Sequence, residues 1–408
     1  MRDRTWKPVC LAVCLSISAS AFASDQKAPA RGLDLEWNLR MRQESVADDA
    51  FLRDASALTL RGRFGIRATL SAGWQALIEG EGVAAAVDRY NSGANGKSTF
   101  PQVIDPTGLE LNQAWLGWKA PKGALTFGRQ RLQFDNQRWV GNSGWRQNEQ
   151  TFDAVAVEWR PSSSVLLRYA GLARVHRVNS DEAIDPLARE RSLASHVVDL
   201  AYTRGENQWG AYWIGHQDRD VRSASTATIG LRWTLVHPTS FGAWGWRVES
   251  ARQSDHAGNP VSFDHGYWLL EPWLKWRGVT WKAGQERLGG NGTHSLQTPL
   301  ATLHAFNGWA DKFLVTPPTG LVDSYLGAGG ALGARNWPAK AAWAVAWHDY
   351  RADAGSAHFG SEIDASVSYP FSPSLLGMVK LADYRANAWS RDTKKLWLQL
   401  EWTPKPRK

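Results

Sequence analysis

The feature that most constrains this chain is a two-residue alternation between apolar and polar side chains. In the segment 58–70, leucine, phenylalanine and isoleucine hold one set of alternate positions. The other set is polar and rich in arginine: Thr59, Arg61, Arg63, Arg67 and Thr69. This period predicts a β-strand with one apolar and one polar face. An arginine facing lipid near the bilayer midplane costs roughly 2–4 kcal/mol, so a membrane-spanning strand must turn all three arginines toward a polar interior.

The same alternation continues along the chain, in the segments 33–42, 165–176, 343–348, 362–369 and 396–402. Short turns alternate strictly with longer loops between these segments. An up-and-down barrel with short periplasmic turns and long outer loops has this order of connections. Roughly eight turns and nine loops give about eighteen strands. We therefore predict an all-β fold, an antiparallel up-and-down transmembrane β-barrel.

A soluble β-sandwich array and a β-propeller are the alternatives to a membrane barrel. A propeller needs a motif repeated at roughly 40–50 residues, and we find no such repeat. The chain has 24 tryptophans among 408 residues. Membrane–water interfaces enrich tryptophan, because its amphipathic ring suits the headgroup level. We expect lipid-facing anchors at Trp244, Trp246, Trp343, Trp347 and Trp402.

The first 23 residues have the pattern of a cleaved signal peptide. Arg2, Arg4 and Lys7 precede an apolar run, and a small-x-small cleavage site ends at residue 23. Both cysteines of the chain lie in this segment, so we expect no thiol chemistry in the mature protein. No later stretch reaches 18 uncharged apolar residues, which argues against a transmembrane helix. We expect residues 24–408 to form a single barrel domain in the bacterial outer membrane.

Two long loops are richer in charged, amide and aromatic side chains than a simple connection between strands requires. The loop 133–150 combines Arg138 and Arg146 with tryptophan and amide side chains. We expect it either to fold inward as a constriction with both arginines projecting, or to form an outer lid or packed rim loop. The loop 289–319 is the longest, and its segment 301–314 has apolar residues at helical spacing. This spacing predicts a short amphipathic helix that plugs or gates the mouth.

Three segments carry a family resemblance. The segment 128–154 contains Gly128-Arg129-Gln130, Asp135, Asn136, Arg138, Gly141, Trp145-Arg146-Gln147-Asn148 and Thr151-Phe152-Asp153-Ala154. The segment 299–313 reads PLATLHAFNGWADKF, and 360–365 reads GSEIDA. These segments resemble the alginate-export family of outer-membrane barrels. The resemblance implies an eighteen-stranded barrel whose lumen is lined with basic residues and passes a uronate polymer.

We predict a basic pore lining, because rings of cations select anions and guanidinium groups pair carboxylates bidentately. The inward placement of Arg129 and Arg131 requires Leu125 and Phe127, at the same alternate positions, to lie near a rim or a bulge. The alternative for each arginine is a salt bridge within the lumen, to acids such as Glu36, Glu79, Glu81 and Glu110. The predicted lining is Arg61, Arg63, Arg67, Arg129, Arg131, Arg138, Arg146, Arg168 and Arg174.

The predicted function is an outer-membrane channel that passes an anionic, alginate-like uronate polymer. A general anion-selective porin for small solutes is one alternative, and an outer-membrane hydrolase is another. Lipase, zinc-protease and phosphate-loop motifs are missing from the sequence. Ser195 and His196 are adjacent, so on a strand they point to opposite faces. We therefore expect no enzyme activity, no catalytic residue, no metal and no cofactor.

The expected partners are outer-membrane lipid and either an anionic polysaccharide or small anionic solutes. A periplasmic secretion partner would favour export over uptake. Basic residues do not gather into a patch or tail, which argues against nucleic acid. About eighteen strands suffice for a self-contained pore, so we expect a monomer.

Overall fold

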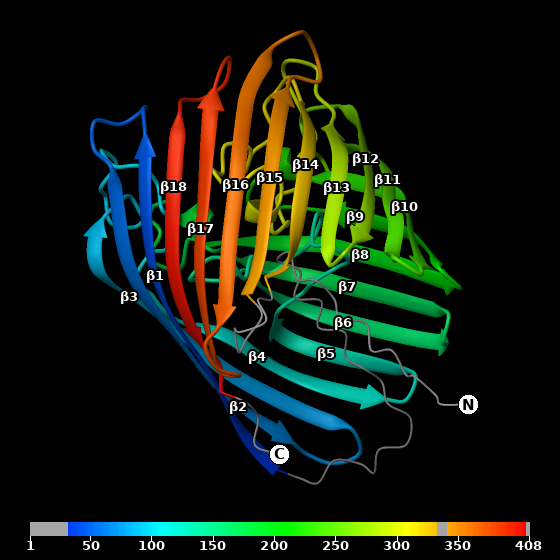
Figure 1. The fold of residues 1–408 in the computed structure, drawn as a ribbon. Helices are drawn as coiled ribbons and strands as arrows, with labels where there is room; N and C mark the ends of the chain where they lie inside the picture. The colour runs from blue at the N-terminus through cyan, green and yellow to red at the C-terminus, as the bar shows by residue number, and fades with distance from the viewer. Residues whose placement is uncertain (1–31, 333–340, 405–408) are drawn as a thin grey trace.

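The computed structural model describes residues 32–332 and 341–404, and these residues form one closed antiparallel sheet of eighteen strands (Figure 1). Each strand pairs with the next along the chain, and β18 closes the ring by pairing with β1. The predicted fold class and strand count are confirmed. The strands are β1 (Gly32–Asp48), β2 (Ala55–Thr69), β3 (Trp74–Arg89), β4 (Gly108–Ala120), β5 (Gly123–Gln130), β6 (Thr151–Ser162), β7 (Val165–His176), β8 (Glu190–Arg204), β9 (Asn207–His216), β10 (Thr226–Thr239), β11 (Gly242–Asp255), β12 (Asp264–Trp276), β13 (Val279–Leu288), β14 (Leu321–Leu332), β15 (Ala341–Arg351), β16 (His358–Pro370), β17 (Leu375–Ala386) and β18 (Thr393–Trp402).

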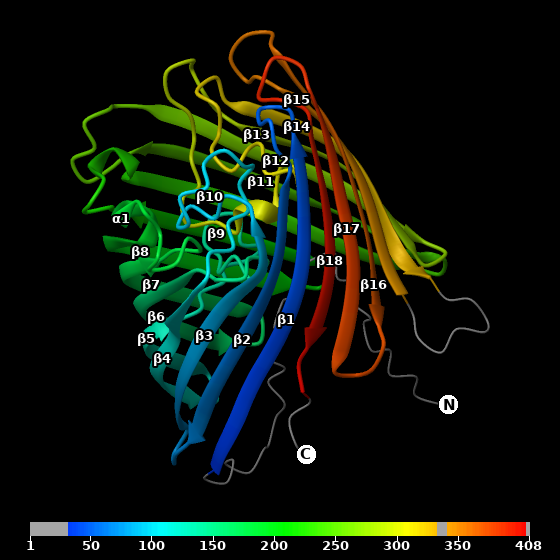
Figure 2. The same ribbon diagram turned by 90° about the vertical axis from the view of Figure 1, so that its left-hand side faces the viewer.

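The two ends of the barrel differ in the length of their connections, as predicted. At the end where β1 begins, connections such as 121–122 and 277–278 are tight turns. At the other end, loops such as 131–150 and 289–320 are long. Figure 2 shows loops that join strands at the upper end of the barrel, opposite the end where β1 begins. Long loops mark the extracellular end of an outer-membrane barrel. The turn predicted at 336–339 and the predicted signal peptide lie outside the described residues.

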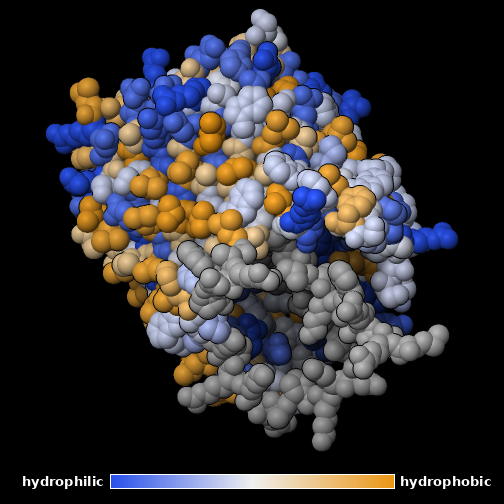
Figure 3. Space-filling view, viewed as in Figure 1, coloured by the Kyte–Doolittle hydropathy of each residue, from blue (hydrophilic) through white to orange (hydrophobic). Residues whose placement is uncertain are grey.

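The wall has an apolar outer face and a polar inner face. On β2, Leu60, Phe64 and Ile66 are exposed on the outer face, whereas Arg61 and Arg63 are buried on the inner face. Figure 3 shows apolar side chains gathered across the middle of one outer face. The alternation in the sequence therefore separates lipid-facing from lumen-facing side chains, because successive residues of a strand point to opposite sides.

Tryptophan concentrates at the periplasmic ends of the strands, on the outer face. A ring there lies at the depth of the lipid headgroups, which suits its apolar body and its polar N–H group. Trp402 also packs edge-on against Trp37, with ring centroids 4.1 Å apart. Exposed tryptophans at this end are Trp74, Trp118, Trp159, Trp209, Trp244, Trp276, Trp281 and Trp402.

A hydrophobic core lies inside the barrel, toward its extracellular half. It joins loop residues such as Leu132 and Val140 to inward-facing wall residues such as Leu172 and Tyr267. The loops 131–150 and 289–320 supply much of this core. They fold into the lumen and bury apolar side chains that would otherwise meet water inside the barrel.

Three short helical turns lie in the loops: α1 (Pro186–Arg189), η1 (Arg222–Ala224) and η2 (Leu303–Ala305). The prediction of an amphipathic helix over 301–314 is wrong, because η2 is the one helical turn in that segment. The backbone has positive φ at Asn307 and Asp311, which ends any regular helix there. None of the helices in the described ranges is long and apolar enough to cross a membrane.

Candidate functional site: the lumen and its inner loops

The first inner loop, residues 131–150 between β5 and β6, crosses the lumen. Near one wall, Trp139 Nε1 donates a hydrogen bond to Glu249 of β11 at 2.8 Å. Near the facing wall, Gln147 Nε2 donates to Thr59 Oγ1 of β2 at 2.9 Å. These strands stand on opposite sides of the ring, nine places apart in the strand order. Of the two placements that we considered for this loop, the structure shows the inward one.

The second inner loop, residues 289–320 between β13 and β14, follows the inner wall toward β18. The backbone N–H of Trp309 donates to Asp364 of β16 at 3.2 Å, and that of Ala310 donates to Glu362 of the same strand at 2.6 Å. The two carboxylates therefore hold consecutive peptide groups of the loop against the wall.

The two inner loops also bind each other. The N–H of Gly141 donates to the carbonyl of Leu300 at 2.9 Å. Arg146 of the first loop pairs with Asp311 of the second at 3.1 Å, and Lys395 of β18 reaches the same carboxylate at 2.7 Å. Burial alone would raise the pKa of Asp311, but Arg146 and its other cationic neighbours hold it well below its usual range. A charged Asp311 thus joins both loops to the wall.

Lys380 of β17 forms the second tie between the loops and the wall. Its Nζ atom lies 4.0 Å from the ring centroid of Trp145, 3.8 Å from that of Trp309 and 5.3 Å from that of Trp397. One ring comes from each inner loop and the third from β18. A desolvated cation over an aromatic face contributes roughly 2 kcal/mol, so this cluster stabilises the inward position of both loops.

Arg138 and Arg146 of the first inner loop do not project into open space, contrary to our expectation for an inward loop. Both side chains are buried. Arg138 pairs with Glu286 of β13 at 2.8 Å, and Arg146 pairs with Asp311. The loop composition showed that cations were present, but not that each would meet an acid. These arginines hold the loop in place, and we do not propose them as pore lining.

Arg61, Arg63 and Arg67 of β2 all face inward, as the alternation predicted. They differ in depth: Arg61 and Arg63 are enclosed by neighbouring side chains, whereas Arg67, nearer the periplasmic end, is partly exposed. Arg40 of β1 lies beside Arg61 and shares its acid. Enclosed arginines that meet a carboxylate contribute to the wall and offer little to a passing solute. Their partners are Glu401 for Arg61, Glu81 for Arg63 and Glu36 for Arg67.

Arg131 and Arg168 differ from these residues, because the arginine is the exposed member of its ion pair. The Arg131 side chain is 31% exposed, and its partners Glu79 and Glu149 are 7% and 1% exposed. The Arg168 side chain is 21% exposed, and that of Asp199, 2.7 Å away, is 2% exposed. Burial alone would raise the pKa of Glu149, but its arginine neighbours lower it to about 2. Both pairs therefore present a cationic face to the solvent in the lumen.

Arg129 does not take the inward position that we expected. Its register continues unbroken from Phe127, which is 64% exposed on the lipid-facing side. Arg129 therefore shares that outer face, where it pairs with Asp153 at 2.9 Å. β5 ends at Gln130, so Arg131 lies beyond the strand and is free to turn into the lumen.

Arg174 also lies on the outer face, although Arg168 of the same strand faces inward. The pairing of β7 slips by one residue at Ala173, which separates Leu172 from Arg174 in the register with β6. Such a bulge reverses the alternation beyond it. Arg174 consequently pairs with Glu190 beside Asp153, near the extracellular rim.

Other lumen cations were missed by the sequence analysis. Arg232 of β10 and Arg247 of β11 both pair with Asp135 of the first inner loop. These cations outweigh burial and lower the pKa of Asp135 to about 2. Lys282 of β13 pairs with Glu271 at 3.1 Å nearer the periplasmic end. The alternation around position 232, with apolar residues at 229, 231 and 233, was a signal that could have identified Arg232.

A serine–histidine pair exists, but with a different histidine from the neighbour in sequence. Ser195 Oγ lies 3.1 Å from His216 Nδ1, and both residues are buried. The hydroxyl also accepts from the N–H of Gln217 at 3.0 Å. Asp218, the nearest acid in the chain, bonds instead to Arg191 and to backbone N–H groups of its own loop. A buried and saturated hydroxyl is a structural group, not a nucleophile poised for substrate.

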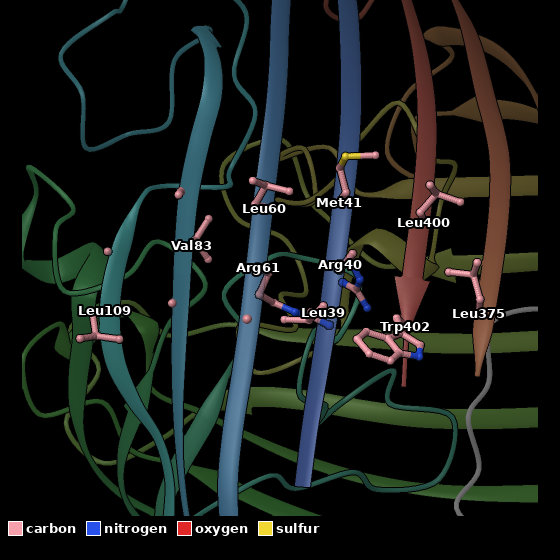
Figure 4. Close-up of a pocket in the computed structure, with 14 residues that line it drawn as sticks. Leu39, Arg40, Met41, Leu60, Arg61, Val83, Leu109, Leu375, Leu400 and Trp402 are labelled. Carbon is pink, nitrogen blue, oxygen red and sulfur yellow. The ribbon is translucent and has the colours of Figure 1, made fainter. Parts of the chain in front are cut away.

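A groove of about 620 Å³ lies on the outer face of the barrel and not in the lumen. Figure 4 shows Leu39, Met41, Leu60 and Leu400 side by side on β1, β2 and β18. All four side chains belong to the exposed apolar set of the wall. The groove therefore faces the acyl chains of the membrane, and the solute path must be sought among the inner loops.

The fold resembles solved outer-membrane barrels. Acinetobacter baumannii OccAB4 is 13% identical, with a TM-score of 0.71, and the match covers 91% of this chain and 98% of that chain. Pseudomonas aeruginosa OccK9 (OpdG) is 15% identical, with a TM-score of 0.72 over 92% and 98% of the two chains. P. aeruginosa OpdK, solved with vanillate, is 13% identical, with a TM-score of 0.68 over 91% and 98%. At these identities the likeness shows the fold alone.

No curated protein matches the sequence. A model of the alginate export family matches residues 31–284, which is more than half of the 408-residue chain. The family match, the eighteen-stranded barrel and the porin-like fold together place the protein in the bacterial outer membrane and indicate a channel rather than an enzyme. The chain belongs to the alginate export family.

Proposed function

We propose that this channel passes small acidic saccharides of the uronate class in preference to neutral sugars. The observation that carries the proposal is the exposure of Arg131 and Arg168 in front of their buried acids. A carboxylate that enters the lumen meets the guanidinium groups, while the acids behind them are shielded. Guanidinium forks match carboxylates bidentately, and the ion pairs already present keep each contact weak enough for release.

The packed inner loops support a small solute over a wide, unselective pore. They bury a hydrophobic core within the lumen and bond to opposite walls. The barrel that was solved with vanillate, a small carboxylate, has the same architecture. The alginate export family points toward uronates as the class of carboxylate.

Export of a uronate polymer is the second candidate, and the family match favours it. A polymer chain would need a continuous path past both inner loops. The two candidates differ in the size of the solute and share the cationic faces of Arg131 and Arg168. Size selection therefore separates them, whereas charge selection tests both.

The test is solute flux into proteoliposomes containing the wild type or the Arg131→Gln/Arg168→Gln variant. Galacturonate, glucose and a long polyuronate are compared at equal concentration. We expect galacturonate to enter the wild type severalfold faster than glucose, and the variant to lose this preference. Arg252→Gln is the matched control, because Arg252 is an exposed arginine paired with Asp264 near the extracellular rim.

Equal entry of galacturonate and glucose into wild-type vesicles would overturn the proposal. Entry of the polymer at a rate comparable with the monomer would favour the export candidate. A variant that keeps the full preference for galacturonate would remove Arg131 and Arg168 from the solute path.

A further inference from the structure

A second cavity lies at the extracellular mouth of the barrel, and neither Arg131 nor Arg168 lines it. It has a volume of about 540 Å³, and several long loops meet around it. Asp48 ends β1 and Phe51 lies in the loop after it, while Lys312 comes from the second inner loop and Trp389 from the loop before β18. The loop 90–107 contributes the rim that faces them.

Cationic side chains outnumber carboxylates in the lining of this mouth cavity. Its lining contains three cationic side chains, Arg146, Lys312 and Lys395, against two carboxylates, Asp48 and Asp311. Lys312 donates to Asp48 at 2.7 Å, and Lys395 donates to Asp311 at 2.7 Å. Lys395 is enclosed and shares Asp311 with Arg146, whereas Lys312 is the more exposed of the two lysines. An ammonium group has three donors, so Lys312 can donate to a bound carboxylate without leaving Asp48.

An aromatic ring stands beside these cations. Trp389 Nε1 donates to the backbone carbonyl of Lys312 at 3.2 Å, and its ring packs on Phe359 with centroids 5.6 Å apart. The tryptophan is therefore fixed at the wall of the cavity, bonded to the backbone of the residue that also supplies an ammonium group to the lining. A flat ring offers an apolar surface to the C–H face of a sugar, while the cations offer partners for a carboxylate.

We propose that this mouth cavity is an extracellular binding site for one acidic sugar residue, with its ring on Trp389 and its carboxylate near Lys312. This proposal rests on the proposed function and adds a place where the solute is held before it reaches the inner loops. The site lies on the extracellular side, so it loads from outside the cell. The mouth cavity concentrates an acidic solute at the entrance to the lumen, where the two inner loops narrow the path.

The test measures binding of trigalacturonate to the full barrel in detergent by calorimetry, with maltotriose as the neutral comparison. The first variant is Trp389→Ala. The second is the paired change Asp48→Asn/Lys312→Gln, which removes the ammonium without leaving a carboxylate unpaired. We expect trigalacturonate to bind the wild type at least about tenfold more tightly than maltotriose, and each variant to lose about tenfold in affinity, or about 1.4 kcal/mol.

Two matched controls keep the test specific. Phe100→Ala removes an aromatic ring from the loop 90–107 that does not line the cavity. Asp88→Asn/Lys97→Gln neutralises an exposed ion pair, also 2.7 Å long, at the same end of the barrel. Both controls should bind trigalacturonate as the wild type does. Heat-modifiable gel mobility confirms that every variant is folded.

Folded variants that bind trigalacturonate with wild-type affinity would overturn the mouth site. Equal affinity for maltotriose in the wild type would overturn its selectivity for acidic sugars. Neither result would touch the proposed function, because that function is measured as a flux preference that depends on Arg131 and Arg168. Conversely, if wild-type vesicles showed no preference for galacturonate over glucose while the barrel still bound trigalacturonate at the mouth, the proposed function would be wrong and the mouth site would stand.

Discussion

Two groups of lumen arginines in this barrel both pair with carboxylates, but they differ in which member of the ion pair is exposed. On β1 and β2, Arg40 and Arg61 are enclosed, and their acid, Glu401, is the more exposed member of each pair. At Arg131 and Arg168 the order is reversed, since the guanidinium group is exposed and the acid is buried. Arginine content alone therefore does not determine the charge that a pore wall exposes to a solute. What matters is which member of each ion pair is in contact with the solvent.

The largest expected effect comes from removing most of the second inner loop. Deletion of residues 296–314 eliminates Leu300, Trp309 and Asp311, which bond to the first inner loop and the wall. We expect single-channel conductance in planar bilayers to rise severalfold, because the lumen loses much of its packed core. An unchanged conductance would mean that the inner loops do not limit the path.

The next largest effect should be a loss of unfolding free energy when an enclosed arginine is replaced. Arg63→Met leaves Glu81 and Glu149 without a cationic partner that the wild type supplies. Removing one member of a buried ion pair costs about 3–5 kcal/mol. Denaturant unfolding in lipid vesicles should show this loss, whereas Arg252→Met, an exposed control, should stay within about 0.5 kcal/mol of the wild type. A small loss for Arg63→Met would show that the pair is not tightly enclosed.

A smaller effect is expected for the cation that joins the inner loops to the wall. Lys380→Met keeps an unbranched side chain of similar length but removes the charge from the rings of Trp145, Trp309 and Trp397. We expect about 2 kcal/mol less stability and noisier single-channel currents, because the loops lose one of their ties. Currents as quiet as those of the wild type would argue that the remaining ties, such as the Arg146–Asp311 pair, are enough to hold the loops.

The smallest effect should appear as a dependence on pH. The pKa of Glu149 is lowered to about 2, below an ordinary glutamate value of about 4.3. Its stabilising contribution is therefore complete above the ordinary value and is lost as pH falls toward 2. The difference in unfolding free energy between wild type and Glu149→Gln should be largest near neutral pH and should shrink below about pH 4. A difference that stays constant on acidification would contradict the assignment.

The sequence predicted the wall well and the interior poorly, for a physical reason. Alternation over β1 and β2 decides which side chains meet lipid, since a misplaced charge there is costly. That rule placed Arg61, Arg63 and Arg67 correctly. It failed for Arg174, because a single bulged residue reverses the alternation. For Arg129 the expectation departed from the rule by assuming a rim or bulge near Phe127, and β5 has no such bulge.

The inner loops depend on contacts between residues far apart in the chain. Arg138 pairs with Glu286, and Arg146 pairs with Asp311, and the two members of each pair are more than a hundred residues apart in the sequence. Local composition showed that the loop was rich in cations and amides, which correctly marked it as important. Whether each cation faced a solute or an acid depended on the fold of the second inner loop, where the helical spacing of apolar residues did not lead to a regular helix.

The most direct test of the central claim compares the two groups of arginines in one measurement. Reversal potential under a KCl gradient is recorded in planar bilayers for the wild type, Arg131→Gln/Arg168→Gln and Arg40→Gln/Arg61→Gln. We predict an anion preference in the wild type that collapses in the first variant and persists in the second. Equal loss in both variants, or no loss in the first, would contradict the claim that exposed guanidinium groups with buried acids set the selectivity of this channel.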